Sequence, residues 1–255
     1  MCLLLFAYRL HPDYPLVVAA NRDEFHRRPT EPARWWADKS VLAGRDLEAG
    51  GTWMGVNRRG RFAVVTNYRD PASNHRELRS RGRVVLEALE HPGPAAALLG
   101  VLEREGPLYN GFNLVFGDSD GLFVYSNRGQ AAPLQPGLYG LSNHLLETPW
   151  PKVTRGKAAL ARYLQGPEIP VIAPLFGLLA DRHVAADAEL PNTGIGLDWE
   201  RRLAPMFIVS PDYGTRASTV LIADRNGQIH YAERSFTPSG DIDGEREFRF
   251  RADSL

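Results

Sequence analysis

The chain has 255 residues, of which 44% are hydrophobic, so it is long enough to bury a sizeable core. Its 30 basic and 30 acidic residues give a formal net charge of zero, so bulk electrostatics do not favour nucleic acid or an anionic membrane as a partner. The single cysteine, Cys2, excludes an internal disulfide and the Cys-x-x-Cys motifs of zinc and redox sites. We expect one domain over residues 1–255, with no metal site.

The first residues of the chain do not have the pattern of a targeting segment. The apolar run over residues 3–8 has no basic region before it and no small-residue cleavage site after it. Neither this run nor any later stretch approaches the roughly 20 apolar residues that a membrane helix needs. We therefore expect a cytoplasmic protein with no membrane span, and the oligomeric state is left open.

Two predicted strands, over residues 2–9 and 16–23, form a hairpin whose second strand ends in the polar run Asn-Arg-Asp-Glu. Period-two alternation places Asn21 and Asp23 on one face of this strand and Arg22 on the other. We expect Asn21 and Asp23 to point inward. The other interpretation is that the polar run only marks the passage from a strand into a loop, which is its usual meaning.

The later elements alternate between blocks of strands and pairs of helices. A loop rich in Arg, Pro and Trp is expected over residues 25–38, followed by two strands around a Gly-containing turn, the second of which ends at Asn67. Further strands are predicted over residues 111–117, 122–127, 138–143, 206–209, 218–223, 228–235 and 247–251, and helices over 80–90, 95–105, 152–164 and 173–182. This order favours an α+β fold with antiparallel sheets and segregated helices, not a doubly wound one.

Two further patterns carry little weight. Residues 117–121 match the Gly-x-Ser-x-Gly expression for a nucleophile elbow, but a strand follows them, whereas an elbow must lead into a helix. The seven histidines are scattered and form no His-x-x-x-His pair. Only His144 is of interest, because it lies beside another candidate residue, Asn143.

Cys2 could carry chemistry because of its position in the chain. Removal of Met1 would leave Cys2 with both a thiol and an α-amine. A thiol of ordinary pKa is only about 3% ionised at pH 7, and an α-amine of pKa near 7.7 to 8.0 can act as its base. The alternative is that a lone cysteine at the start of an apolar strand is a small buried hydrophobic residue.

Several motifs in chain order resemble those of one family. They are Cys2, Asn-Arg-Asp-Glu-Phe (21–25), Gly-Thr-Trp-Met-Gly (51–55), Thr-Asn-Tyr (66–68), Tyr-Asn-Gly-Phe-Asn-Leu (109–114), Tyr-Gly-Leu-Ser-Asn (139–143) with Leu-Glu-Thr-Pro-Trp (146–150), and Tyr-Gly-Thr-Arg (213–216). Together they resemble the NRDE family, whose eukaryotic members are called transport and Golgi organisation protein 2. The resemblance implies a four-layer αββα N-terminal nucleophile hydrolase-like sandwich with antiparallel sheets.

The chain is also similar, at a coarser level, to the penicillin V acylase and bile salt hydrolase branch of that superfamily. The resemblance implies a catalytic set of Cys2 as nucleophile, Asp23 near the free amine, Asn67 and Asn143 as oxyanion donors, and Arg216. One position departs from the branch, which has an arginine three residues before the aspartate. Here that position is Ala20, and the nearby arginine is Arg22.

The resemblance implies two alternative functions. The first is hydrolysis of a non-peptide amide or thioester by Cys2, with a substrate-binding set of Asn21, Arg22, Trp53, Tyr68 and His144. The second is binding and trafficking of haem or of an acyl-lipid or acyl-coenzyme A species without turnover. An amphipathic pocket for such a ligand could be lined by Trp35, Trp36, Trp53, Tyr68 and Trp150. Ordinary packing explains each of these aromatic residues as well. No cofactor is required, and haem is a possible ligand.

Overall fold

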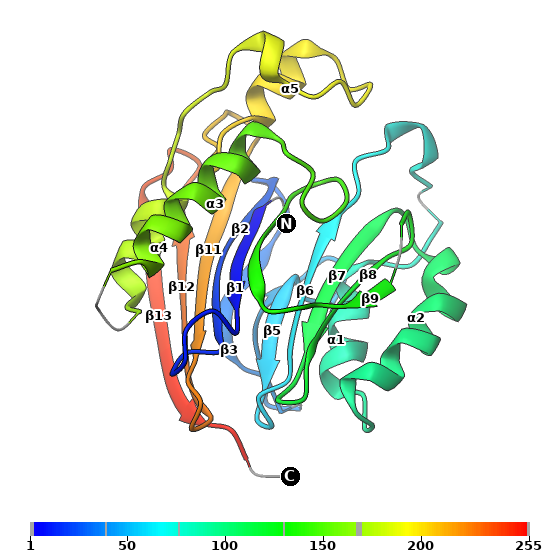
Figure 1. Cartoon of the computed structure of the whole chain (residues 1–255). Helices are drawn as coiled ribbons and strands as arrows, with labels where there is room; N and C mark the ends of the chain where they lie inside the picture. Colours follow the sequence, from blue (N-terminus) through cyan, green and yellow to red (C-terminus); the bar gives the residue numbers. More distant parts are fainter. Residues whose placement is uncertain (1–2, 39, 76, 130, 167–169, 254–255) are drawn as a thin grey trace. The chain divides into compact units, whose positions relative to one another are not determined.

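Two antiparallel sheets, each with helices against one face, account for most of the chain (Figure 1). The structure is a computed structural model, and it describes all residues except 1–2, 39, 76, 130, 167–169 and 254–255. Its contacts divide the chain into two compact units. The first unit comprises residues 1–27, 136–142 and 146–250, and the second comprises residues 28–135, 143–145 and 251–255.

The first unit contains a six-stranded sheet in the order β10-β1-β2-β11-β12-β13. Its strands are β1 (Leu3–Tyr8), β2 (Leu16–Phe25), β10 (Gly137–Leu141), β11 (Tyr213–Ala223), β12 (Gln228–Phe236) and β13 (Ile242–Arg251). Its helices are α3 (Pro151–Leu164), α4 (Ile172–Leu179) and α5 (Leu197–Leu203), with a 3-10 turn at Asp187–Glu189. Figure 1 shows α3 and α4 along one face of this sheet.

The core of the first unit lies between its sheet and helices α3 and α4. Alternate residues of β1 and β2, among them Leu5 and Val17, pack against these helices, as strand geometry requires of a half-buried sheet. Gly156 lets α3 approach closely, because a Cβ atom there would lie 2.6 Å from Leu5 Cδ1. The odd-numbered residues of β1 and β2 therefore face the helices, and the even-numbered residues face the other side of the sheet.

The second unit contains a seven-stranded sheet whose strands follow chain order from β3 to β9. The strands are β3 (Thr30–Trp35), β4 (Val41–Asp46), β5 (Met54–Asn57), β6 (Phe62–Asn67), β7 (Phe112–Gly117), β8 (Leu122–Ser126) and β9 (Ala131–Pro133). Helices α1 (Gly82–Glu90) and α2 (Leu98–Glu105) and 3-10 turns at Pro71–Ser73, Ala95–Ala97 and Gly106–Leu108 complete it. The apolar face of α1, with Val84, Val85, Ala88 and Leu89, closes the core.

Most of the predicted elements are confirmed. All four predicted helices are present, and the expected strand pairs flank the hairpin turns between β5 and β6, β7 and β8, and β11 and β12. Residues 118–121 connect β7, which ends at Gly117, to β8, so the rejection of a nucleophile elbow there is confirmed. The longest described helix, α3, has 14 residues, and no described helix is long and apolar enough to cross a membrane.

The loop predicted over residues 25–38 is wrong, because β3 lies within it. Proline normally argues against a strand, because it has no backbone N–H to donate to a neighbouring strand. Pro32 is tolerated because β3 is an edge strand, which has a neighbour on one side only. The short elements β4, β9 and α5 were not predicted either.

The strand predicted over residues 206–209 is also wrong. These residues are apolar and, except for Val209, buried, but their backbone groups bond to a mixture of side chains and single backbone groups and form no ladder with a neighbouring strand. The Met206 carbonyl accepts a hydrogen bond from Asn21 Nδ2, and the Ile208 amide donates to Thr215 Oγ1. Burial without sheet pairing explains why an apolar run was mistaken for a strand.

Candidate functional site

Asn21 lies where the apolar part of β2 becomes polar. It is opposite Leu3 in the register of β1 and β2, so the start of β1 adjoins the polar end of β2. The Asn21 side chain is fully buried, and its Nδ2 donates to the carbonyl oxygens of Leu179 at 3.0 Å and Met206 at 2.7 Å. Its Oδ1 accepts a hydrogen bond from Ser218 Oγ at 2.6 Å. Asn21 therefore fixes the polar end of β2 to β11 and to the end of α4.

Asp23 is buried and hydrogen-bonded, as the alternation along β2 predicts. Thr215, its partner in the register with β11, donates from Oγ1 to Asp23 Oδ1 at 2.7 Å. The same Oγ1 accepts the Ile208 amide at 2.9 Å, so the Thr215 hydroxyl hydrogen is directed at the carboxylate. Asp23 is only 2% exposed, and this chain of hydrogen bonds holds it in one orientation.

Arg22 lies on the other face of the sheet, away from α3 and α4. It is opposite Ala217 in the register and is 4% exposed. The same face carries the buried residues Thr219, Tyr231 and Glu233, and Thr219 lies opposite Glu233. Burial, followed by the charge of Glu233, raises the pKa of Tyr231 well above its ordinary value. This face therefore carries a buried polar group that sequence reasoning missed.

A weak signal for that group exists in the sequence. Ser218 and Thr219 come directly before the apolar run at the end of β11, and Glu233 follows the buried Tyr231 and Ala232 in β12. Polar residues in a buried strand need hydrogen-bond partners, so their presence indicates that other buried polar groups lie nearby. Their partners, however, come from strands distant in sequence.

Arg216 occupies the irregularity where the register of β2 and β11 shifts, between Thr215 and Ala217. Its Nη1 donates to the carbonyl oxygens of Phe25 at 3.1 Å and His26 at 3.0 Å. The extra residue lets the guanidinium turn onto the backbone that follows β2. Arg216 therefore holds the backbone just beyond β2.

In the second unit, Asn67 and Asn143 lie together. Asn143 Nδ2 donates to the Asn67 carbonyl at 3.0 Å, and the Arg69 amide donates to the Asn143 carbonyl at 2.7 Å. Asn143 is 4% exposed, whereas Asn67, the last residue of β6, is half-buried. These bonds fix residues 143–145 against the end of β6.

Tyr68 and His144 form a second pair in the same unit. Tyr68 Oη lies 2.9 Å from His144 Nε2, and the two ring centroids are 4.9 Å apart. Burial lowers the pKa of His144, which favours the neutral imidazole at neutral pH. Asn113 holds this segment, because its Nδ2 donates to the His144 carbonyl at 2.8 Å and to Thr66 Oγ1 at 3.0 Å. A neutral imidazole beside a phenol can accept or relay a proton.

The tryptophans mostly serve packing. Trp53 is 5% exposed and packs so tightly on β4 that a Cβ atom at Gly44 would lie 2.3 Å from its ring. Trp36 Nε1 donates to the Ala43 carbonyl at 2.9 Å, and Trp150 belongs to the core of the first unit. Trp35 is stacked by the Arg58 guanidinium at 4.1 Å from the ring centroid. A shared amphipathic pocket of these residues stays a prediction.

Cys2, the predicted nucleophile, lies outside the described residues. The other predicted site residues fall into two groups, each described within its own unit. In the first unit, the second half of β2 carries Asn21, Arg22 and Asp23, and Arg216 of the neighbouring β11 bonds to the last residue of β2. In the second, Asn67, Tyr68, Asn143 and His144 form one hydrogen-bonded cluster, and Trp53, just before β5, packs against β4.

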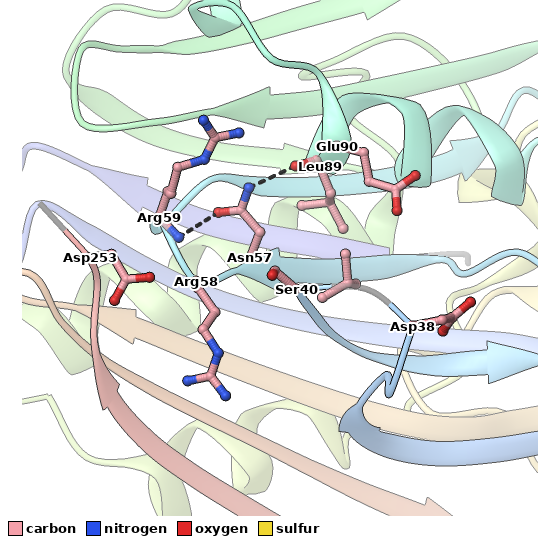
Figure 2. Close-up of a pocket in the computed structure, with 9 residues that line it drawn as sticks. Asp38, Ser40, Asn57, Arg58, Arg59, Leu89, Glu90 and Asp253 are labelled. Carbon is pink, nitrogen blue, oxygen red and sulfur yellow. Dashed lines mark hydrogen bonds between the residues drawn. The ribbon is translucent and has the colours of Figure 1, made fainter. Parts of the chain in front are cut away.

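The second unit also has a hollow of about 560 Å³ beside the turn between β5 and β6 (Figure 2). Asn57 lies at its wall, where its Nδ2 donates to the Leu89 carbonyl and its Oδ1 accepts the Arg59 amide. The charged lining is mixed and consists of Asp38, Arg58, Arg59, Glu90 and Asp253. None of the predicted site residues lines it, and the mixed charges favour no single class of ligand. Among the described residues, no group of three or more His, Cys, Asp or Glu side chains could hold a metal ion.

Comparison with known proteins shows both a family and a fold. Residues 1–238 match the family described as Transport and Golgi organisation 2. A bovine Transport and Golgi organization protein 2 homolog is 38% identical, with 99% of this chain and 100% of the relative covered. The human homolog is 37% identical, with 92% and 93% covered.

Two solved structures that resemble this chain are named as hydrolases. A mutant of conjugated bile acid hydrolase from Clostridium perfringens has a TM-score of 0.54 at 8% identity, with 99% of this chain and 97% of that chain covered. An N-acylethanolamine-hydrolyzing acid amidase ortholog from Caenorhabditis elegans has a TM-score of 0.51 at 10% identity, with 87% and 92% covered. At such low identity the likeness shows the fold alone, which is that of the N-terminal nucleophile hydrolases.

Proposed function

Because this chain belongs to the Transport and Golgi organisation 2 family and has the N-terminal nucleophile hydrolase fold, we propose that it is a cysteine hydrolase of a non-peptide amide or thioester. The observation that carries the proposal is the pre-organised end of β2. Leu3, the first residue of β1, lies opposite buried Asn21, and Asp23 is oriented by Thr215. Cys2 directly precedes β1 in the sequence. The oriented carboxylate of Asp23 therefore belongs to the end of β2 that adjoins the start of β1.

The proposed chemistry uses the two groups of Cys2 once Met1 has been removed. The neutral α-amine takes the thiol proton, and the thiolate forms a bond to the substrate carbonyl carbon. The tetrahedral intermediate collapses with loss of an amine or thiol, which takes the proton from the α-ammonium group. Water then attacks the acyl-Cys2 thioester and transfers a proton to the α-amine. The Cys2 thiolate leaves and takes this proton from the α-ammonium group, which releases the carboxylic acid and restores free Cys2.

Asp23 has a positioning role in this proposal. An ionised carboxylate near an α-amine favours the ammonium form that arises after the first proton transfer. The Asp23 carboxyl group is held in place by the hydrogen bond from Thr215 Oγ1, at 2.7 Å. The family resemblance assigns the oxyanion donors to Asn67 and Asn143, and loss of one such donor typically lowers kcat by about 10² to 10³.

The test compares protein with a free Cys2 amine against protein with an uncleavable extension before Cys2. Both forms are incubated with a panel of acyl amides and acyl thioesters, and intact mass and product release are measured. We expect acylation of Cys2 and turnover only with the free amine, since an amide nitrogen cannot accept the thiol proton. Cys2→Ala abolishes both signals, whereas Asn226→Ala, in the turn between β11 and β12, leaves them unchanged.

The thiol itself provides a second readout that needs no substrate. The iodoacetamide labelling rate is followed against pH in both forms, and the free-amine form should react faster below pH 8. Equal labelling curves with an ordinary thiol pKa, together with no turnover in either form, would overturn the hydrolase proposal. Binding of haem or an acyl lipid that is the same in both forms would then favour a carrier function on this fold.

A further inference from the structure

Three of the four sheet edges have features that prevent another strand from adding to them. β3 contains Pro32 and has a register irregularity between Glu31 and Arg34. β9 has only three residues and ends in Pro133. In β10, the backbone N–H and C=O of Gly140 are both bonded to Glu147, at 2.6 Å and 2.9 Å. Proline, irregular register and short or covered edges are common ways to block edge pairing.

β13 forms the fourth edge and lacks these features. It has ten residues, contains no proline, and pairs with β12 on one side only among the described strands. Seven of its ten residues are exposed, including Glu247 and Arg249. A long exposed edge presents a row of backbone donors and acceptors that can pair with another strand. β13 also lies beyond residues 1–238, so the family match does not assign it a role.

The charges of β13 are arranged to complement a second copy of the same strand. Along one face, alternation places Glu245, Glu247, Arg249 and Arg251 in that order. If two copies of β13 run antiparallel about a two-fold axis at Phe248, then Glu247 lies opposite Arg249 and Glu245 lies opposite Arg251. Each pair occurs twice because of the symmetry, which gives four oppositely charged cross-strand pairs.

Other registers are less favourable. A two-fold axis at Glu247 would place this carboxylate opposite its own copy, and an axis at Arg249 would do the same with two guanidinium groups. An axis at Arg246 would place Glu245 opposite Glu247. Charged residues on an edge strand can also serve to keep the edge solvated and unpaired. That protective role does not require an order of charges in which two antiparallel copies place opposite charges side by side in one register.

The contacts within one chain leave this pairing possible. Glu247 Oε1 lies 2.7 Å from His230 Nε2 and 2.8 Å from Arg249 Nη2, so both of these contacts use the same oxygen. Glu245 Oε2 accepts a hydrogen bond from Arg234 Nε at 2.6 Å. In both glutamates the second carboxylate oxygen can receive an arginine of the other copy, since a carboxylate accepts several hydrogen bonds.

We propose that two copies of this chain associate through β13, with Phe248 on the two-fold axis, so that their six-stranded sheets form one continuous antiparallel sheet. The two-fold axis is perpendicular to the sheet, because only this direction makes the strands antiparallel and keeps each face on its own side. Phe248 of one copy then packs against Phe248 of the other, on the face opposite to the charged pairs. The interface is isologous and closes after two copies.

Charge-reversal variants test the proposal. Sedimentation equilibrium over a range of protein concentrations gives the molar mass in solution, and from it the dimer dissociation constant of each variant. Glu247→Arg and Arg249→Glu each create two like-charged pairs and should raise the dimer dissociation constant about tenfold or more. The variant that combines both substitutions restores opposite charges and should dimerise nearly as well as the natural chain. Arg162→Glu, an exposed reversal on α3, is the matched control and should have no effect.

A disulfide tests the register directly. In a Cys2→Ser background the chain has no other cysteine, and Phe248→Cys places one thiol opposite its symmetry copy, within the Cα separation that a disulfide needs. Oxidation should give a covalent dimer. Arg246→Cys, four residues out of register with its own copy, should not. A monomer at all concentrations, a dimer that ignores the reversals, or equal cross-linking at 246 and 248 would each overturn the proposal.

Discussion

At the scale of single residues, hydrogen bonds within the fold hold the side chains that end β2. The Asn21 amide bonds two carbonyl oxygens and one hydroxyl, and Asp23 receives the Thr215 hydroxyl. A carboxylate that is buried and held by a donor is costly to remove, because the donor is then left buried and unsatisfied. This cost distinguishes Asp23 from its neighbour Glu24, which is less buried.

Asp23→Ala should therefore lower the free energy of unfolding by about 1 to 3 kcal/mol, whereas Glu24→Ala should change it by about 0.5 kcal/mol or less. Urea unfolding followed by tryptophan fluorescence measures both. Asp23→Asn, which keeps an oxygen acceptor for Thr215, should fall between the natural chain and Asp23→Ala. Equal urea midpoints for the Ala variants at 23 and 24 would show that the bond from Thr215 contributes little.

His144 should make stability depend on pH. Burial lowers its pKa in the folded protein, so below its ordinary pKa the unfolded chain binds more protons than the folded one. The free energy of unfolding should therefore fall as the pH is lowered from about 7 to about 5. His144→Gln removes this contribution and should flatten the slope of stability against pH over that range. If stability varied with pH in the same way in the natural chain and in His144→Gln, the lowered pKa assigned to buried His144 would be contradicted.

At the scale of elements, close packing and side-chain hydrogen bonds decide where strands form. β4 and β5 approach Trp53 without space for a side chain at Gly44. The segment at 206–208 forms no strand ladder, because its backbone groups bond separately to the Asn21 side chain, to the Asp181 carbonyl and to Thr215. The bulge at Arg216 turns its guanidinium onto the end of β2. These features are set by contacts between segments far apart in the chain.

Two glycines in the second unit provide a matched pair of substitutions. Gly44→Ala introduces a Cβ atom 2.3 Å from the Trp53 ring and should destabilise the protein by about 1 to 3 kcal/mol. Gly100→Ala lies on exposed α2 with no atom within 4 Å of the new Cβ, and should stabilise by up to about 1 kcal/mol. Thermal or urea unfolding gives both signs, and the total tryptophan fluorescence, to which Trp53 contributes, should change only in Gly44→Ala. Equal effects of the two substitutions would contradict the packing of Trp53 on β4.

At the scale of the whole molecule, each unit is one antiparallel sheet with helices against one face, and β13 is an unprotected edge of the first. Pairing of two copies through that edge links stability to protein concentration, because the unfolded chain does not pair. The consequence can be measured without any substrate. It is therefore independent of the proposed hydrolysis.

The melting temperature of the natural chain should rise with protein concentration, whereas that of Glu247→Arg should rise much less at concentrations below its higher dissociation constant. The variant that combines Glu247→Arg with Arg249→Glu should recover the dependence. Differential scanning calorimetry at two or more concentrations provides the measurement. A melting temperature that does not depend on concentration in the natural chain would argue against association through β13.

The sequence by itself predicted the elements whose signals are local. Period-two and helical spacing located all four longer helices and most strands, and alternation correctly placed Asn21 and Asp23 on one face of β2 and Arg22 on the other, although Arg22 is buried as well. The motifs beginning with Cys2 and the Asn-Arg-Asp-Glu run indicated the family and the fold that comparison shows. Local spacing is sufficient here because the side chains of one strand or helix repeat with a fixed period.

Only the tertiary structure decided which partners each polar residue has. Thr215 and Ser218 meet Asp23 and Asn21 across more than 190 residues of chain, and Glu233 joins Thr219 across a neighbouring strand. The position of β13 at a sheet edge likewise follows from strand order, which no local pattern encodes. The physical reason is that a buried hydrogen bond depends on distances between strands, and these are set by the register of the whole sheet and not by the residues on either side.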